Sequence, residues 1–150
     1  METKARETVL KVDNLRINFR AYGGLVQAVR GVSFDVKRGE TVAIVGESGS
    51  GKSVSIKAIM GILANNAIIE DGTIEYDGMD LTKVKEAQFH EIRGKRIGLI
   101  FQDPLSALNP IMKIGKQITE VLLINDRKMT KEAAKERALE LMREIGRAHV

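Results

Sequence analysis

The spacing of apolar residues changes period several times along the chain, and its early part predicts strands. Apolar residues occupy mostly alternate positions in three stretches, which is the period of a half-buried strand. These stretches are residues 9–19, 32–36 and 72–76. Residues 42–45 and 97–101 are continuously apolar instead, which is typical of strands buried on both faces of a parallel sheet. The sequence therefore predicts strands of two kinds.

Helical spacing governs the remaining segments. Residues 53–63 and 83–92 predict two helices, the first buried and the second polar. β-Branched residues in the first argue against a helix, but the glycine-rich loop before it outweighs that propensity. Beyond Pro110, two more helical faces follow, and Thr130 is the expected N-cap of the last helix. Their members are Ile114, Ile118, Val121 and Leu122 on one face, and Ala134, Ala138, Leu141, Met142 and Ile145 on the other.

Composition and charge exclude several classes of protein. The chain has 150 residues, 29% charged and 43% hydrophobic, which is an ordinary globular composition. Its net charge is +4, with basic and acidic residues interspersed, so nucleic acid is not an expected partner. Cysteine is absent, which excludes disulfides and thiolate metal sites. No apolar stretch approaches the roughly 18 residues of a membrane-spanning helix, so any membrane association would come through a partner.

A glycine-rich segment follows the first continuously apolar run and matches the P-loop pattern G-x-x-x-x-G-K-[S/T]. Its glycines allow a tight turn that aims backbone N–H groups inward, at the N-terminus of the helix that follows. Lys52 would supply a cation for the β- and γ-phosphates, and Ser53 a hydroxyl ligand for Mg²⁺. A chance glycine-rich turn is the alternative, and the flanking strand and helix argue against it. The residues expected to bind the nucleotide here are Gly46, Ser48, Gly49, Ser50, Gly51, Lys52 and Ser53.

A glutamine 50 residues after Lys52 lies in a segment, Ile100 to Pro104, that resembles the Q-loop of ABC-type ATPases. In that family a glutamine follows a buried strand and can contact both the metal shell and a neighbouring subunit. The resemblance implies that Gln102 senses the γ-phosphate and Mg²⁺. Lys52 and Gln102 are then the expected catalytic residues, and Ser53 and Gln102 the expected metal ligands. The alternative is that Gln102 is only a polar residue at a strand end.

The longer run FQDPLSALNP, residues 101–110, is similar to one branch of that family, the ATP-binding subunits of bacterial oligopeptide/dipeptide (and nickel) importers. The resemblance covers about residues 9–144. It implies that Tyr22 stacks on the adenine ring, an interaction worth about 1–3 kcal/mol by analogy with other base stacking. The alternative for Tyr22 is packing within its glycine-rich turn. Residues from Gln102 through Asn109 would lie near the surface that docks a membrane subunit.

This resemblance also implies a fold and a set of partners. The expected fold is α/β, a P-loop NTPase core of the ABC ATPase type, with N-terminal antiparallel strands and the start of the helical subdomain. ATP and Mg²⁺ are the expected cofactors. The expected partners are two membrane permease subunits, a second ATP-binding subunit and an external solute-binding protein. The protein would act at the cytoplasmic face of the inner membrane and couple ATP hydrolysis to uptake of peptides or a related solute.

Three motifs of the family are not found in this sequence: an LSGGQ-type signature, a buried strand ending in Asp-Glu, and a switch histidine. Asp126 ends an apolar run, but that run continues a helical stripe, and His90 lies in a charged stretch. We therefore expect residues 1–144 to be a truncated, partial ABC ATP-binding domain, inactive alone, with its catalytic base elsewhere. A truncated sheet would leave unpaired backbone and exposed apolar residues beside the P-loop strand.

The last six residues, 145–150, carry a separate hypothesis. They can be encoded by a nucleotide sequence that resembles a widely used sequencing adapter, so we expect them to be a read-through artefact and His149 not to be a switch histidine. A natural Ile-Gly helix end is the alternative. Two other functions also stay open: a soluble ABC-type ATPase that acts on nucleic acid, and a fragment that only binds nucleotide.

Overall fold

The computed structural model describes residues 7–105 and 107–146. The chain divides into two compact units, with the boundary between Arg93 and Gly94. Each unit is described by itself. His149 and most of the expected artefactual tail lie outside the described residues.

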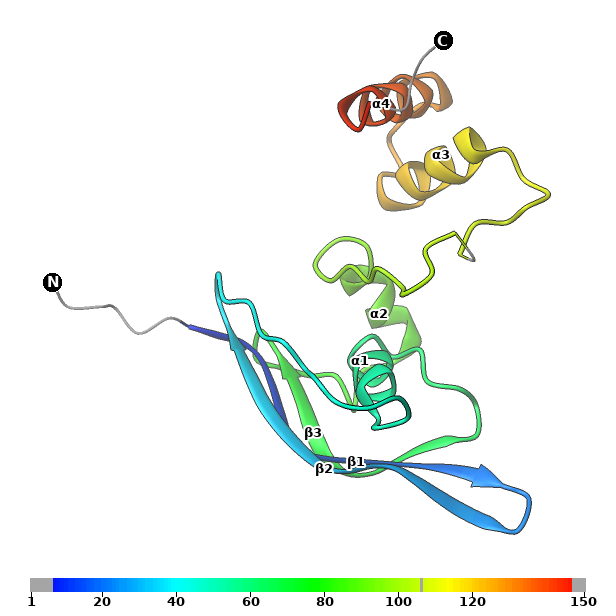
Figure 1. The fold of residues 1–150 in the computed structure, drawn as a ribbon. Helices are drawn as coiled ribbons and strands as arrows, with labels where there is room; N and C mark the ends of the chain where they lie inside the picture. Colours follow the sequence, from blue (N-terminus) through cyan, green and yellow to red (C-terminus); the bar gives the residue numbers. More distant parts are fainter. Residues whose placement is uncertain (1–6, 106, 147–150) are drawn as a thin grey trace, which may run out of the picture. The chain divides into compact units, whose positions relative to one another are not determined.

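A four-stranded antiparallel sheet forms the body of the first unit, in the order β2-β1-β3-β4. Figure 1 labels its three long strands. A turn at Tyr22 and Gly23 joins the first two strands, and Gly23 adopts a φ of 98°, which favours glycine. Strand β1 pairs with β2 on one side and β3 on the other. The strands are β1 (Thr8–Ala21), β2 (Gly24–Lys37), β3 (Ala67–Tyr76) and β4 (Met79–Asp80).

Buried side chains of β1 and β3 form part of the interior of the first unit, and β1 has register shifts between these buried positions. Val12, Leu15 and Ile17 of β1 and Ile74 of β3 are almost completely buried. Asn18 is also buried, and its side-chain amide donates a hydrogen bond of 2.8 Å to a carboxylate oxygen of Glu70. These residues connect β1 and β3 through buried packing and a side-chain hydrogen bond.

Two short helices complete the first unit, α1 (Lys52–Ile59) and α2 (Glu86–Ile92). Helix α1 lies over the sheet and contacts β1 and β2 (Figure 1). Ala58 and Ile59 of α1 and Phe89 and Ile92 of α2 are buried. The sheet and α1 together position the P-loop, since the loop ends where α1 begins.

The second unit contains a pair of packed helices, α3 (Ile114–Asn125) and α4 (Lys131–Glu144). Thr130 caps α4 as the sequence predicts, because its hydroxyl accepts a hydrogen bond of 3.2 Å from the backbone N–H of Ala133. Ala134 and Ala138 of α4 are buried. Among the described residues, no helix combines the length and apolar character needed to cross a membrane.

The predicted antiparallel strands and the predicted helices are confirmed, with β2 longer and α1 shorter than the pattern indicates. Asp126 follows the end of α3, so the helical interpretation of that run is also correct. His90, which lies in a charged stretch of the sequence, is exposed.

The prediction of buried strands at residues 42–45 and 97–101 is wrong. Neither run forms a strand beyond a single bridge at Ile97, and Val45 and Ile100 are 91% and 90% exposed. A strand buried on both faces needs neighbours that supply hydrogen bonds and cover. No described strand pairs with either run, which accounts for the exposed apolar side chains.

Candidate nucleotide-binding site

The predicted P-loop forms a tight turn between residues 41–45 and α1. The backbone N–H of Ser50 donates to the carbonyl of Glu47 at 3.2 Å, and Gly49 and Gly51 have φ values of 82° and 89°. A Cβ added to Gly51 would lie 2.6 Å from the backbone carbonyl oxygen of Ala28 in β2. Only glycine therefore permits this turn to approach the sheet so closely.

The side chain of Lys52 folds back into the turn. Its ammonium donates to the carbonyl oxygens of Gly46 at 2.7 Å and Glu47 at 2.6 Å, and to the hydroxyl of Ser50 at 3.1 Å. These acceptors come from the start and from the later part of the turn, so the ammonium lies within the turn. The positive charge thus lies within the turn, where it is bonded to oxygens of the protein itself.

The N-terminal end of α1 strengthens the preference for an anion. Its first N–H groups have no partner within the helix, and no acidic residue lies in its first turn. The side chain of Ser53 is exposed there, so its hydroxyl is accessible to a ligand. Backbone donors, a lysine and an accessible hydroxyl therefore meet at one helix end, as binding of a phosphate chain requires.

Ser55 contributes to the same site, and the sequence analysis missed it. It is buried, and its hydroxyl donates a hydrogen bond of 3.1 Å to the carbonyl of Gly51. This bond fixes the junction between the loop and α1. The signal in the sequence is a serine four residues after Gly51, a spacing at which Ser bonds back to the preceding helical turn.

The two predicted site residues outside the loop have different settings. Tyr22 is fully exposed at the end of the β1–β2 hairpin, so the alternative that it packs within its turn is wrong. Gln102 is exposed in an irregular segment of the second unit. Because Lys52 belongs to the first unit and Gln102 to the second, their proximity remains a prediction.

Asn109, at the end of the segment after Gln102, is bonded to α3 by a residue that sequence reasoning missed. The side-chain amide of Gln117 donates to the carbonyls of Asn109 at 3.0 Å and Met112 at 2.8 Å, and its oxygen accepts the N–H of Asn109 at 2.9 Å. The described residues between 101 and 110 are all exposed. The expected docking segment thus leads into the start of α3 through defined hydrogen bonds.

The titratable groups with shifted pKa values lie outside the P-loop. Hydrogen bonds from Lys83 and Thr82 lower the pKa of Asp80, and hydrogen bonds from Arg93 lower the pKa of Glu86. In the part of the chain that the structure describes, no three His, Cys, Asp or Glu side chains gather as a metal site would require. The Ser53 hydroxyl is the group of the P-loop that the sequence pattern assigns to Mg²⁺.

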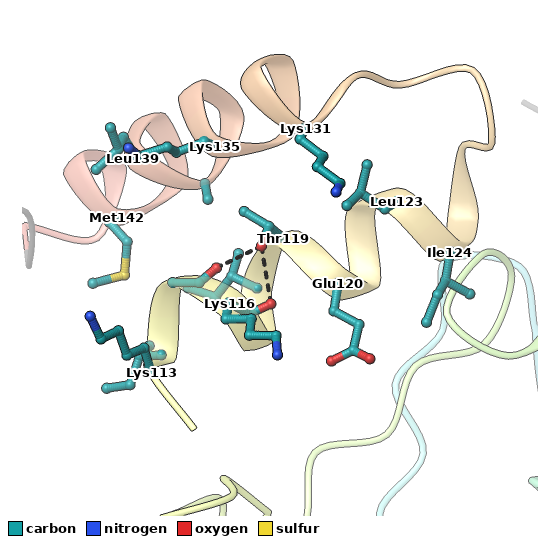
Figure 2. Close-up of a pocket in the computed structure, with 14 residues that line it drawn as sticks. Lys113, Lys116, Thr119, Glu120, Leu123, Ile124, Lys131, Lys135, Leu139 and Met142 are labelled. Carbon is teal, nitrogen blue, oxygen red and sulfur yellow. Dashed lines mark hydrogen bonds between the residues drawn. The ribbon is translucent and has the colours of Figure 1, made fainter. Parts of the chain in front are cut away.

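A large groove lies elsewhere, on the α3–α4 pair, with a volume of about 960 Å³ (Figure 2). Apolar side chains such as Leu123, Leu139 and Met142 line it, with lysines that include Lys116 and Lys135. None of its lining residues belongs to the glycine-rich segment that matches the P-loop pattern. The P-loop therefore remains the candidate nucleotide site.

Comparison with known proteins decides the family. The family model described as ABC transporter matches residues 29–150. The chain belongs to the ABC transporter family. The family is the one that the sequence resemblance indicates.

The curated relatives are ATP-binding proteins of peptide transport. The chain is 52% identical over 142 residues to the dipeptide transport ATP-binding protein DppD of Lactococcus lactis subsp. cremoris, covering 95% of the chain and 41% of the relative. It is also 52% identical over 139 residues to the oligopeptide transport ATP-binding protein OppD of Bacillus subtilis, covering 92% of the chain and 38% of the relative. The expected resemblance to peptide importers is confirmed, and the chain spans about two fifths of these relatives.

Solved structures confirm the fold. A dimeric ABC cassette, MJ0796, in a post-hydrolysis state bound to ADP and Pi, superposes with a TM-score of 0.76 at 26% identity and covers 89% of this chain and 56% of its own. Part of a Clostridium perfringens ABC transporter complex, cbiO1, gives a TM-score of 0.65 at 25% identity, covering 93% and 51%. The ABC ATPase fold class is thus shown.

Proposed function

We propose that this chain carries the phosphate-binding part of the ATP-binding subunit of a peptide importer. The observation that carries the proposal is the ammonium of Lys52, held inside the turn of residues 46–53 at the N-terminal end of α1. The ADP and Pi bound to the MJ0796 cassette support a nucleotide ligand, and the names of the curated relatives support peptide transport.

The chain's own residues divide the work of binding ATP. Lys52 exchanges its bonds to the carbonyls of Gly46 and Glu47 for bonds to β- and γ-phosphate oxygens, while the backbone N–H groups of the turn hold the remaining oxygens. Ser53 offers its hydroxyl to Mg²⁺, which would neutralise phosphate charge when bound. The exposed ring of Tyr22 is available to stack on the adenine.

Gln102 has a distinct role in the proposal. Its amide would help to hold the metal shell and sense the γ-phosphate when MgATP is bound, and its exposed segment would pass the state of the nucleotide to a membrane subunit. Residues through Asn109 lie near the docking surface, which is consistent with their exposure and with their attachment to α3 by Gln117. Hydrolysis of ATP then drives the transport step.

The proposal also includes a wider assembly. The proposal places the protein at the cytoplasmic face of the inner membrane, with two permease subunits, a second ATP-binding subunit and an external solute-binding protein. The dimeric state of the MJ0796 cassette supports the second ATP-binding subunit. Dipeptides or oligopeptides are the solute class, in line with the relatives' names.

The test of this function is MgATP affinity in the intact protein. Lys52→Ala removes a charged donor to phosphate, worth about 1.5–3 kcal/mol, so the Kd should rise about 10- to 150-fold. Lys57→Ala is the matched control, since Lys57 is an exposed lysine of the same helix. Its Kd should stay within about twofold of the unsubstituted protein. Equal affinities for the Lys52→Ala variant and the unsubstituted protein would remove the proposed site.

A further inference from the structure

The guanidinium of Arg93, immediately after α2, reaches the far end of the P-loop helix. Its Nε donates to the carbonyl of Met60 at 2.7 Å, and Nη2 donates to the carbonyl of Gly61 at 2.8 Å. These carbonyls follow the last turn of α1, where the helix presents unsatisfied acceptors and the negative end of its dipole. A single cation therefore caps the C-terminal end of α1.

The same guanidinium is held on its other side by α2. Nη1 and Nη2 donate to the two carboxylate oxygens of Glu86 at 2.6 Å and 3.1 Å, and the group lies 4.6 Å from the centre of the Phe89 ring. The planar, forked shape of guanidinium permits bonds to a carboxylate and to two carbonyls at once. Arg93 thus connects α1 and α2 through fixed directions.

Gly61 shows how closely this connection is packed. Its φ is 62°, and an added Cβ would lie 2.6 Å from an atom of the Phe89 ring and 2.9 Å from Nη2 of Arg93. Only glycine leaves room for the ring and the guanidinium at this place. The turn after α1 is therefore shaped around Arg93.

Helix α1 is consequently fixed at both ends. Its N-terminal end rests on β2, where Gly51 meets the carbonyl of Ala28, and its C-terminal end is held by Arg93. The phosphate-binding turn lies at the first of these ends. Any tilt of α1 would move the N–H groups and Lys52 relative to a bound triphosphate.

We propose that Arg93 is a positioning residue of the nucleotide site, which holds α1 against α2 so that the phosphate-binding turn at the opposite end of α1 keeps its geometry. The proposal rests on the nucleotide binding proposed above. Arg93 does not contact the nucleotide in this account. Loss of such indirect support typically lowers affinity about 10- to 100-fold at metal sites, and we expect the low end of that range here.

The experiment measures MgATP affinity of the intact protein, at a temperature below the unfolding midpoint of every variant. Arg93→Ala should raise the Kd about tenfold. Arg93→Lys keeps the charge without the fork and should raise it about threefold. Arg38→Ala is the matched control, because Arg38 forms ion pairs with Glu7 and Asp77 in the same unit without a described contact to α1. Its affinity should stay within about twofold.

The outcomes separate this proposal from the proposed function. Unchanged affinity in Arg93→Ala, with weakened affinity in Lys52→Ala, overturns the role of Arg93 alone. Unchanged affinity in Lys52→Ala overturns the proposed site itself. A purely structural role would lower the unfolding midpoint and leave the affinity of the folded protein unchanged. Should Arg93→Ala fail to fold, Arg93→Lys decides, and full affinity in that variant contradicts the proposal.

Discussion

Two apolar regions of the first unit differ sharply in their strand pairing and in the burial of their side chains. Strand β1 pairs on both sides, and its residues Leu15 and Ile17 are completely buried. Residues 42–45 are as apolar by sequence, yet they form no strand among the described residues, and Val45 is 91% exposed. The P-loop begins where this unpaired run ends and finishes where α1 rests on the sheet.

The difference shows that apolar sequence alone does not make a strand. A two-residue turn joins β1 to β2, so the hydrogen bonds between these two strands form with little loss of chain entropy. A strand of a parallel sheet needs a partner that is distant in sequence. The C-terminal end of the phosphate loop is therefore held by contacts with the sheet. Its N-terminal end follows residues 42–45, which pair with no described strand.

The largest expected effect is a difference in the free energy of unfolding between substitutions in β1 and in residues 42–45. Leu15→Ala in the 150-residue chain should lower the free energy of unfolding by about 2–5 kcal/mol, because it leaves a cavity under the sheet. Val45→Ala should change it by less than about 0.5 kcal/mol, because that side chain is already in solvent. Urea unfolding followed by circular dichroism measures both. Equal effects would show that residues 42–45 are buried as β1 is.

A smaller effect tests the end of the P-loop that lies against the sheet at Gly51. Gly51→Ala should destabilise the chain by about 2–3 kcal/mol, since its Cβ would meet the Ala28 carbonyl at a positive φ. Gly49→Ala is the matched control, with a similar φ and no atom within 4 Å of an added Cβ. It should cost about 1 kcal/mol. Urea unfolding again provides the comparison, and a larger loss at Gly49 would contradict the close approach at Gly51.

The smallest expected effect is a pH dependence in the first unit. Hydrogen bonds to Lys83 and to Arg93 lower the pKa values of Asp80 and Glu86 in the folded chain. The unfolded chain therefore binds more protons in acid, and the stability that these groups contribute is present above about pH 4.5. It is lost as the pH falls through the lowered pKa values. Unfolding midpoints between pH 6 and roughly pH 3 should fall less in Asp80→Asn/Glu86→Gln than in the unsubstituted chain; parallel curves would exclude the effect.

Local patterns predicted much of the fold and the loop. Alternation predicted β1 and the end of β2, the P-loop pattern placed the turn and the start of α1, and Thr130 marked the start of α4. Each of these signals lies within a few residues of the structure it specifies. The site residues of the P-loop were accessible to sequence reasoning for the same reason.

Interactions between distant residues were not predictable in this way. The bond between Arg93 and the carbonyls of Met60 and Gly61 joins positions more than 30 residues apart, and nothing in the local pattern indicates it. The exposed state of residues 42–45 likewise depends on which partners are present. Tyr22 was placed in a turn correctly, but its full exposure depends on the hairpin extending into solvent.

The position of Lys52 with ATP bound tests the account most directly. A crystal structure of the intact protein with Mg²⁺ and a non-hydrolysable ATP analogue measures it. We expect the Lys52 ammonium to leave the carbonyls of Gly46 and Glu47 and lie about 2.7–2.9 Å from β- and γ-phosphate oxygens. An analogue bound elsewhere, with Lys52 still bonded to both carbonyls, would contradict the account.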